Sequence, residues 1–210
     1  MSGLPRIIVI TDRTQVQGLL DDVVKDLCTE AGCAWILVRE RDLQPLERRT
    51  LALRLREITK RCGSHMSVSA DPQLASEMNA DGVHLQRIAD VAEARRKLPD
   101  AWIGVSAHRI AEVEAAKEAG ADYVTLSPIF PSESKPGYGP PLGLESIHRA
   151  AQFGIPVYAL GGVTPRSAHA CIEAGAHGIA VMGTVMRARD PSAIIREYAA
   201  AFATGSVRAG

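Results

Sequence analysis

The sequence predicts an α/β protein in which strands and helices alternate within one domain. Short apolar runs recur along the 210 residues, segments with helical spacing separate most of them, and a junction of small residues ends several of the helices. The runs are nearly continuous in apolar character, as expected of parallel strands that are buried on both faces. Eight such units favour a closed (β/α)8 TIM barrel, and an open doubly wound sheet is the second choice.

The predicted strands are the apolar, β-branched runs Arg6–Thr11, Ala34–Arg39, Met66–Ser69, Gly82–Leu85, Trp102–Ser106, Tyr123–Leu126, Pro156–Leu160 and Gly178–Met182. Apolar residues at helical spacing predict the helices between them. These are Val16–Glu30, Leu46–Arg61, Val91–Leu98, Ile110–Ala119, Leu144–Phe153, Ser167–Ala174 and Ile194–Phe202. The order of the elements is therefore that of repeated strand–helix units.

A junction of small residues marks where a helix ends and the next strand begins. It reads Ala31-Gly32-Cys33-Ala34, Ala119-Gly120-Ala121-Asp122 and Ala174-Gly175-Ala176-His177, with Asn79-Ala80-Asp81-Gly82 as a weaker copy. Glycine fits there because the residue after a helix usually needs a positive φ. The repetition supports the barrel.

No domain boundary interrupts the chain, so residues 1–203 are predicted to form one barrel domain and residues 204–210 a frayed tail. The Gly- and Pro-rich stretch Pro131–Gly143 lies inside a strand–helix unit, which favours a long functional loop over a linker. Thr11-Asp12-Arg13-Thr14 follows the first strand, where a dinucleotide-binding fold would have a glycine-rich turn.

The composition is that of a globular protein without a charge bias. Hydrophobic residues make up 46% and charged residues 23%, and 24 Lys and Arg balance 24 Asp and Glu. A zero formal charge argues against non-specific binding to nucleic acid or to a membrane surface, because both need an excess of cationic side chains. No apolar run approaches the ~18 residues of a membrane span, and no signal-peptide pattern opens the chain.

The four cysteines, Cys28, Cys33, Cys62 and Cys171, are scattered without the pairing of a metal site. Such spacing is typical of reduced packing residues in an intracellular protein. We therefore expect a cytoplasmic location.

Residues at the carboxyl ends of the strands are the candidates for chemistry, since these ends and the loops after them form the active face of a parallel barrel. Arg39 and Arg41 end the second run with period-two spacing, so both guanidiniums can point toward the barrel mouth. Two such groups suit a di-anion, because each offers paired donors to phosphate oxygens. A solvated charge cluster is the alternative interpretation.

The loop after the sixth run offers a second set of donors. Ser132, Ser134 and Lys135 lie close together on this Pro-braced segment. Hydroxyls beside a cation suit a pyrophosphate and the charge that develops on a leaving group. An ordinary surface loop of turn-forming residues is the alternative.

Glycines follow the last two strands, where barrels commonly bind phosphate on backbone amides. They are Gly161 and Gly162 after the seventh run, and Gly183, which follows Met182, after the eighth. Bare glycines let an anion approach the main chain, and tight turns are the alternative explanation. Thr164 is in position to cap the next helix.

Two further residues lie at the predicted active face. His84 comes at the end of the fourth run and Ser106 at the end of the fifth, with His108 just beyond it. We consider His84 and Ser106 as ligand contacts. The other histidines fall on helices or strand starts, where a structural or exposed role is expected.

Several motifs occur in order over residues 7–190. They are Ile10-Thr11-Asp12-Arg13, Arg39-Glu40-Arg41-Asp42, Asp81-Gly82-Val83-His84-Leu85, Gly104-Val105-Ser106-Ala107-His108, Ser127-Pro128-Ile129-Phe130-Pro131-Ser132-Glu133-Ser134-Lys135, Gly161-Gly162-Val163-Thr164 and Gly178-Ile179-Ala180-Val181-Met182. With these motifs the chain resembles the thiamine phosphate synthase family, which includes the related thiazole tautomerase TenI.

The resemblance implies a transferase of thiamine biosynthesis with small phosphorylated substrates. Such an enzyme joins hydroxymethylpyrimidine diphosphate to hydroxyethylthiazole phosphate and releases pyrophosphate. The implied route is dissociative: pyrophosphate departs with the help of magnesium, and the thiazole nitrogen captures a pyrimidine carbocation.

The resemblance also implies a role for each candidate residue. Those that would hold the pyrophosphate, or line the same loop, are Arg39, Arg41, Lys135, Ser132 and Ser134. Those that would surround the pyrimidine and the reacting centre are His84 and Ser106. Those that would receive the thiazole phosphate on backbone amides are Gly161, Gly162, Met182 and Gly183.

The chain departs from the family pattern at the magnesium ligands. The family has Asn-Asp after the third strand and Gly-Gln-Glu-Asp after the fourth, and the last acid of each binds magnesium. Here Ser69-Ala70 and Gln86-Arg87-Ile88-Ala89 take these places, and Asp71 and Asp90 follow one residue later. The displaced pair is the candidate Mg2+ site, while Asp90 also suits the N-cap of the helix at Val91.

Two more departures concern the choice between branches of the family. Leu37 stands where the synthase pattern has glutamine, and Pro128 stands where the tautomerase branch has its catalytic histidine. The sequence therefore leaves two alternatives to a synthase open, a TenI-like thiazole tautomerase and a non-catalytic paralogue that binds thiazole phosphate. It also leaves a homodimer open.

Overall fold

A closed barrel of parallel strands forms the centre of the computed structural model, which describes residues 3–131 and 140–203. Each strand pairs with the next along the chain, and β8 pairs with β1 to close the ring. The strands are β1 (Ile7–Ile10), β2 (Trp35–Val38), β3 (His65–Ser69), β4 (Gly82–Leu85), β5 (Trp102–Ala107), β6 (Tyr123–Leu126), β7 (Val157–Leu160) and β8 (Gly178–Val181). This confirms the predicted (β/α)8 barrel.

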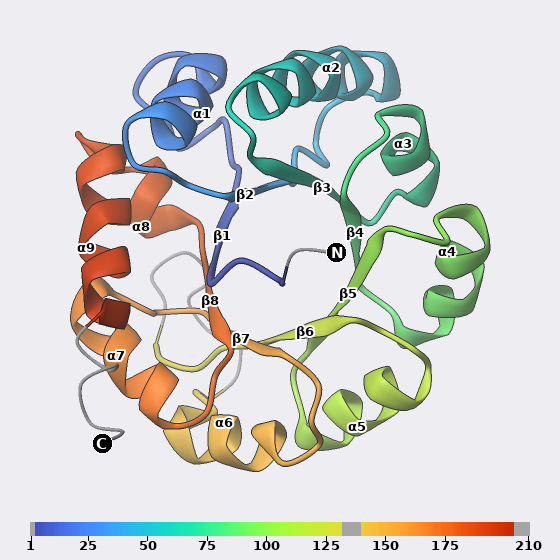
Figure 1. Ribbon diagram of the computed structural model, residues 1–210, viewed down its shortest axis with the longest axis vertical. Coiled ribbons are helices and arrows are strands. Elements are labelled where there is room, and N and C mark those ends of the chain that lie inside the picture. The colour runs from blue at the N-terminus through green and yellow to red at the C-terminus, as the bar shows by residue number, and fades with distance from the viewer. Residues whose placement is uncertain (1–2, 132–139, 204–210) are drawn as a thin grey trace.

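The helices surround the ring of strands (Figure 1). They are α1 (Leu20–Thr29), α2 (Pro45–Arg61), α3 (Pro72–Glu77), the 3-10 turn η1 (Ile88–Asp90), α4 (Val91–Lys97), α5 (Ile110–Glu118), α6 (Gly143–Ala151), α7 (Pro165–Glu173), α8 (Gly183–Met186) and α9 (Pro191–Ala203). The expected tail at 204–210 and residues 132–139 of the loop between β6 and α6 lie outside the described residues.

The helices differ most from the prediction in three places. α1 begins at Leu20 rather than at Val16, and apolar periodicity does not predict α3 or α8. A helix of six or four residues has too few turns to show a period. The start of α3 is nevertheless marked in the sequence, because Asp71 caps it through a 2.9 Å hydrogen bond from the Leu74 amide and Pro72 takes the first helical position.

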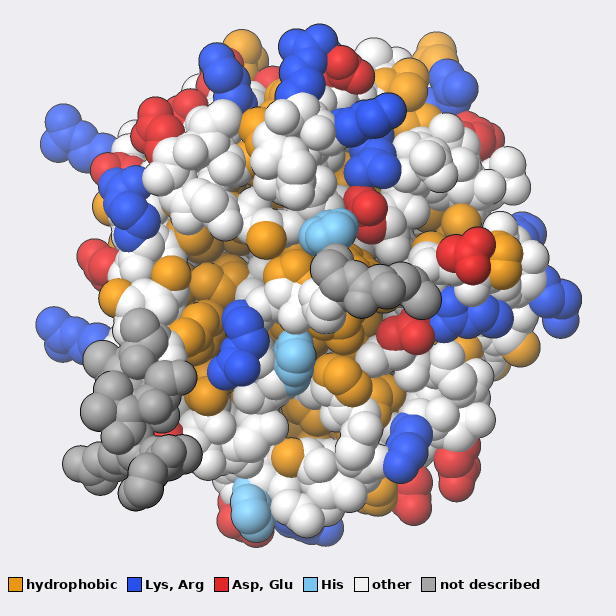
Figure 2. Space-filling view, viewed as in Figure 1, with side chains coloured by type: hydrophobic (Ala, Val, Ile, Leu, Met, Phe, Trp, Pro, Cys, Tyr) orange, Lys and Arg blue, Asp and Glu red, His pale blue; other side chains and the backbone are white. Residues whose placement is uncertain are grey.

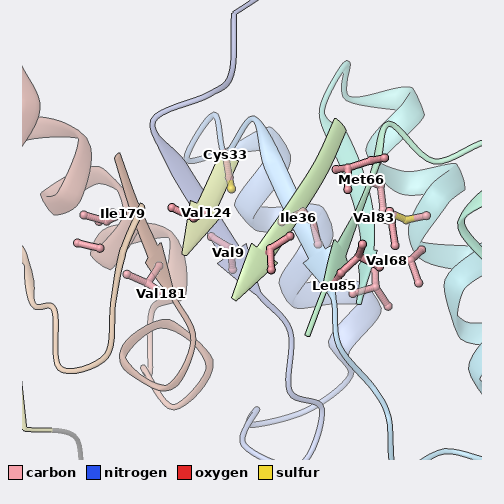
Figure 3. Packing of buried hydrophobic residues seen from close by; sticks show 14 of the residues in the cluster. Val9, Cys33, Ile36, Met66, Val68, Val83, Leu85, Val124, Ile179 and Val181 are labelled. Carbon is pink, nitrogen blue, oxygen red and sulfur yellow. The ribbon is translucent and has the colours of Figure 1, made fainter. Parts of the chain in front are cut away.

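Two hydrophobic layers stabilise the barrel, because successive residues of a strand face opposite sides of the sheet. The outer layer lies between the strands and the helices, and Figure 3 shows Val9, Ile36 and Val68 within it. The inner layer fills the barrel and is made of Ile8, Ile10, Trp35, Leu37, Tyr123, Tyr158 and Ala180. The rings of Trp35, Tyr123 and Tyr158 meet edge to face at centroid distances of 5.0–5.7 Å. The barrel is therefore packed and has no open channel at this level.

The amino end of the described chain crosses the end of the barrel where the strands begin (Figure 1). The Tyr158 hydroxyl donates to the Pro5 carbonyl at 2.5 Å, and His177 Nε2 lies 3.0 Å from the Leu4 carbonyl. Charged side chains of both signs are interspersed around this face (Figure 2). The amino-terminal segment is therefore held across the start of the barrel interior at this end.

The helix-to-strand junctions have the predicted backbone. The glycine in each of the three complete copies has a positive φ, and in the weaker copy Asn79 takes this conformation at φ 46°. The junction at 79–82 contributes a further contact. One carboxylate oxygen of Asp81 accepts hydrogen bonds from the buried Met66 amide at 2.8 Å and from Arg56 at 2.7 Å.

Replacing Asp81 with alanine is expected to lower the free energy of unfolding by about 1.5–3 kcal/mol, because the buried Met66 amide loses a charged acceptor. Asp21→Ala is the matched control, since the exposed Asp21–Arg54 ion pair is worth at most about 1 kcal/mol. Urea denaturation of the two variants measures the difference. Equal losses would show that the Asp81 carboxylate acts only as a surface charge.

The cysteines pack as predicted. All four are free thiols, and Cys28, Cys33 and Cys171 are buried. Burial raises the pKa of Cys33 to about 12, which keeps this thiol protonated and unreactive. Within residues 3–131 and 140–203, no helix has both the length and the apolar character that a membrane crossing requires.

Candidate active site

The candidate residues lie together at one end of the barrel. Arg39 follows β2, His84 lies in β4, Ser106 lies in β5, Gly161 follows β7 and Met182 follows β8. Because the strands are parallel and the ring is closed, the carboxyl ends of all of them meet at the same mouth. The predicted loop residues Ser132, Ser134 and Lys135 lie outside the described residues.

Three guanidiniums gather at the carboxyl ends of β2 and β3. Arg41 donates from Nε and Nη2 to the Ser69 hydroxyl, at 3.2 and 2.8 Å. Arg48, from the first turns of α2, donates to the Ser69 carbonyl at 2.5 Å. Desolvation lowers the pKa of Arg41, and the nearby charges of Arg39 and Arg48 lower it further. The mouth is therefore strongly cationic on this side.

The acidic residues that alternate with these arginines face elsewhere. Glu40 is 1% exposed and accepts two hydrogen bonds, at 3.1 and 3.2 Å, from the backbone amide of Arg13. The Arg13 side chain also pairs with Asp42 at 2.6 Å. Residues 40 and 42 are thus tied to the loop after β1, whereas the Arg41 side chain reaches Ser69 at the end of β3.

His84 lies in a buried network of hydroxyl groups. Its Nδ1 is 3.2 Å from the Tyr123 hydroxyl, and its Nε2 is 3.1 Å from Ser106 Oγ and 3.2 Å from Thr125 Oγ1. Desolvation, with a smaller contribution from Arg41, lowers the pKa of His84 to about 3. The imidazole is therefore neutral at physiological pH, and it can donate one hydrogen bond and accept another.

A glycine turn after β7 packs directly against the loop after β6. Gly161 and Gly162 have φ of 90° and 66°. A Cβ on Gly162 would lie 2.3 Å from the Pro131 carbonyl oxygen, and the Gly161 carbonyl accepts a hydrogen bond from the Phe130 amide at 3.0 Å. Neither a positive φ nor this contact tolerates a larger residue at position 162.

Backbone amides at this turn and at the start of α8 are available to a ligand. Among the described residues, the amides of Gly161, Gly162 and Gly183 donate to no acceptor. Thr164 caps α7 as predicted, in a reciprocal capping box with Ser167. The end of the barrel near β7 and β8 thus offers neutral donors, in contrast to the arginines near β2.

The two carboxylates predicted to bind magnesium have other partners. Asp71 caps α3 with one oxygen and accepts from Arg48 at 3.2 Å with the other. Asp90 pairs with Arg87 at 2.6 and 3.0 Å, which lowers the pKa of Asp90, and it makes no side-chain hydrogen bond to the helix that it precedes. No group of three His, Cys, Asp or Glu in the described parts of the chain is arranged to hold a metal. These residues do not fit a magnesium site.

A family comparison agrees with this geometry. Residues 7–185 match the family described as thiamine monophosphate synthase. The chain belongs to this family. The match covers all the strands and every described candidate residue of the mouth.

Individual members of the thiamine monophosphate synthase family are similar to the chain over most of its length. The thiamine-phosphate synthase of Bacillus velezensis is 35% identical over 83% of this chain and 81% of its own. The bifunctional protein ThiM/ThiE of Symbiobacterium thermophilum is 39% identical over 86% of this chain, which spans only 38% of that longer protein. The solved thiamine phosphate pyrophosphorylase of Pyrococcus furiosus superposes with a TM-score of 0.83 at 27% identity, over 95% of this chain and 96% of that one.

Sequence reasoning missed some residues that contact side chains or strand ends of the mouth. Arg48 belongs to a helix, and its position in the predicted amphipathic pattern gives no sign that it reaches over to β3. Tyr123 and Thr125 were assigned only to a strand, although their spacing places both on the inner face with His84. Period-two spacing from the start of β6 was the available signal.

Proposed function

We propose that the protein joins hydroxymethylpyrimidine diphosphate to hydroxyethylthiazole phosphate, forming thiamine phosphate and pyrophosphate. Family membership supports this class of transferase. The observation that carries the proposal is that one mouth holds two different sets of donors that suit anions. One consists of the guanidiniums after β2, and the other of the free amides after β7 and β8, with β1 between them.

In the proposed reaction, the bond between the pyrimidine methylene carbon and the diphosphate oxygen breaks, and the electron pair leaves with pyrophosphate. The thiazole nitrogen then donates its lone pair to that carbon, which forms the new C–N bond. Arg39 and Arg41 stabilise the negative charge on the departing group, with Lys135 as a further candidate. The amides of Gly161, Gly162 and Gly183, with Met182 beside them, hold the thiazole phosphate so that its nitrogen faces the same carbon.

His84 and Ser106 are proposed to contact the pyrimidine. A neutral imidazole does not repel a carbocation, whereas an imidazolium would. The low pKa of His84 therefore suits this position. The metal that the family resemblance implies enters no step here, because Asp71 and Asp90 are held by other partners.

The test is turnover of both substrates by the intact protein, with pyrophosphate release and thiamine phosphate formation followed together. Formation of both products at equal rates supports the proposal. Proton exchange or tautomer conversion of a thiazole phosphate carboxylate, seen by NMR without pyrophosphate release, would instead indicate a TenI-like tautomerase. Binding of thiazole phosphate with neither reaction would indicate a binding protein.

Replacing Arg41 with methionine is expected to lower kcat/KM about 10- to 100-fold, because the departing pyrophosphate loses a charge-assisted hydrogen bond. Arg41→Lys keeps the charge without the paired donors, so its kcat/KM should lie between those of the wild type and Arg41→Met. Arg61→Met is the control, since Arg61 is exposed at the other end of α2. Steady-state kinetics measures all three, and equal kcat/KM for Arg41→Met and Arg61→Met would contradict the assignment.

The proposed setting of this reaction is the cytoplasm, where free thiols are kept reduced. Small phosphorylated molecules are the partners that the site is built to bind. A homodimer, and the absence of nucleic-acid partners, stay predictions that a measurement of mass in solution and a nucleic-acid binding assay would test.

A further inference from the structure

On the cationic side of the mouth, the positive charge of the arginines exceeds the negative charge of the carboxylates paired with them. Among the described residues Arg39 and Arg41 form no ion pair, whereas the acids beside them in the sequence are both taken by Arg13. Arg48 has one carboxylate partner, Asp71. The three guanidiniums therefore form one direct ion pair, Arg48 with Asp71, and the Asp12 carboxylate interacts with Arg39 only at longer range. An anion is the group that would balance the remaining charge.

Ser69 holds two of these guanidiniums close together before any ligand arrives. The Ser69 hydroxyl accepts a hydrogen bond from Arg41, and the Ser69 carbonyl accepts one from Arg48. The Arg48 side chain is only 13% exposed, and its Nε is a buried donor without a hydrogen-bond partner in the described structure. Burying a guanidinium and holding like charges beside it both cost free energy. The pKa of Arg41 is lowered first by desolvation and then by the charges of Arg39 and Arg48. A bound anion offsets the repulsion between these charges.

We propose that Arg39, Arg41 and Arg48 together take the charge of the diphosphate directly, and that Arg48 supplies the compensation that a carboxylate-held magnesium would otherwise give. This inference rests on the proposed function, because diphosphate is the leaving group there. A diphosphate suits the cluster better than a monoanion, since it carries several charges and enough oxygens to meet more than one planar guanidinium.

Binding of the diphosphate through magnesium and direct binding by the guanidiniums predict opposite effects of replacing Asp71. If Asp71 were a magnesium ligand, Asp71→Asn would weaken diphosphate binding. If the guanidiniums bind the diphosphate directly, Asp71 competes with it for Arg48, so Asp71→Asn leaves the affinity unchanged or raises it. Asparagine caps a helix about as well as aspartate, so α3 is preserved in this variant.

The experiment is calorimetric titration of the intact protein with inorganic pyrophosphate, once in EDTA and once with magnesium. We expect binding in EDTA, a loss of affinity of about tenfold or more in Arg48→Met, and intermediate affinity in Arg48→Lys. The matched control is Arg49→Met, because Arg49 is the next residue of α2 and pairs with Glu77 of α3 at 3.0 Å outside the cluster. Arg49→Met should leave the affinity for pyrophosphate unchanged. If Arg48→Met does not fold, the comparison is made with Arg48→Lys.

Binding that requires magnesium, equal affinities in the Arg48 and Arg49 variants, or a loss of affinity in Asp71→Asn would each overturn the inference. These outcomes are separate from the fate of the proposed function. A protein that binds pyrophosphate in EDTA but does not turn over both substrates keeps the inference and loses the synthase assignment. A protein that forms thiamine phosphate but binds pyrophosphate only with magnesium does the reverse.

Discussion

Gly162→Ala is expected to lower the free energy of unfolding by about 2–5 kcal/mol and to weaken phosphate binding at the turn after β7 by about 100-fold. Its φ of 66° costs a residue with a Cβ about 1–2 kcal/mol. The new methyl group would also lie 2.3 Å from the Pro131 carbonyl oxygen and 2.8 Å from the Phe130 carbonyl carbon, and forcing it in costs about 1–3 kcal/mol more.

The functional effect of Gly162→Ala follows from the same contact. To relieve it, the turn after β7 must move away from the loop after β6, and the amides of Gly161 and Gly162 move with it. Affinity for inorganic phosphate or thiazole phosphate should then fall about 100-fold, the equivalent of losing two backbone hydrogen bonds to a charged group. Titration calorimetry beside urea denaturation measures both effects in one variant.

Gly120→Ala is the control for backbone strain alone. Gly120 has a φ of 86°, but a Cβ there would meet nothing within 4 Å. This variant should lose only about 1–2 kcal/mol and keep its phosphate affinity. If Gly162→Ala is no less stable than Gly120→Ala and binds phosphate normally, the turn is not the rigid cradle that the structure indicates.

His84 is expected to make the protein acid-sensitive. Burial lowers its pKa from 6.5 to about 3 in the folded state, so below pH 6.5 the unfolded chain takes up a proton that the folded protein does not. The stabilising contribution is complete above pH 6.5 and is lost progressively as the pH falls toward 3. Between pH 7 and pH 4 the loss amounts to about 3 kcal/mol, at about 1.4 kcal/mol per unit.

The comparison of wild type with His84→Gln isolates this contribution, because glutamine does not titrate and can still bond to neighbouring hydroxyls. The wild type should lose about 3 kcal/mol more than the variant when urea denaturation is repeated at pH 7 and pH 4. His148→Gln removes an exposed histidine of α6 and serves as the control. Parallel curves for wild type and His84→Gln would mean that the buried imidazole is protonated in the folded state.

Most of the fold could be predicted because its signals are local. A buried parallel strand reads as a short apolar run, and a glycine or asparagine after a helix marks each of the four predicted junctions, including Asn79 at φ 46°. Helices α3 and α8 escaped because six and four residues cannot show a period. The start of α3 is instead marked by the cap at Asp71, and α8 begins directly at Gly183 without a side-chain cap.

The site could be predicted only in part, because its residues come from separate elements. Strand ends and glycine turns are visible in the sequence, so Arg39, Arg41 and Gly162 could be placed. Arg48 could not, since a contact from a helix across to Ser69 depends on the tertiary packing of α2 against β3. The prediction that Asp71 and Asp90 bind magnesium has no support in the structure for a similar reason. Their ion pairs with Arg48 and Arg87 are visible only in three dimensions.

The hydrogen bonds that hold Leu4 and Pro5 against the start of the barrel affect how substrates enter and products leave. With that end covered and the interior filled by aromatic rings, everything that enters the mouth must leave by the same opening. The two substrates and two products of the proposed reaction then share one opening. Where one molecule covers another in the mouth, the covered molecule binds first and leaves last.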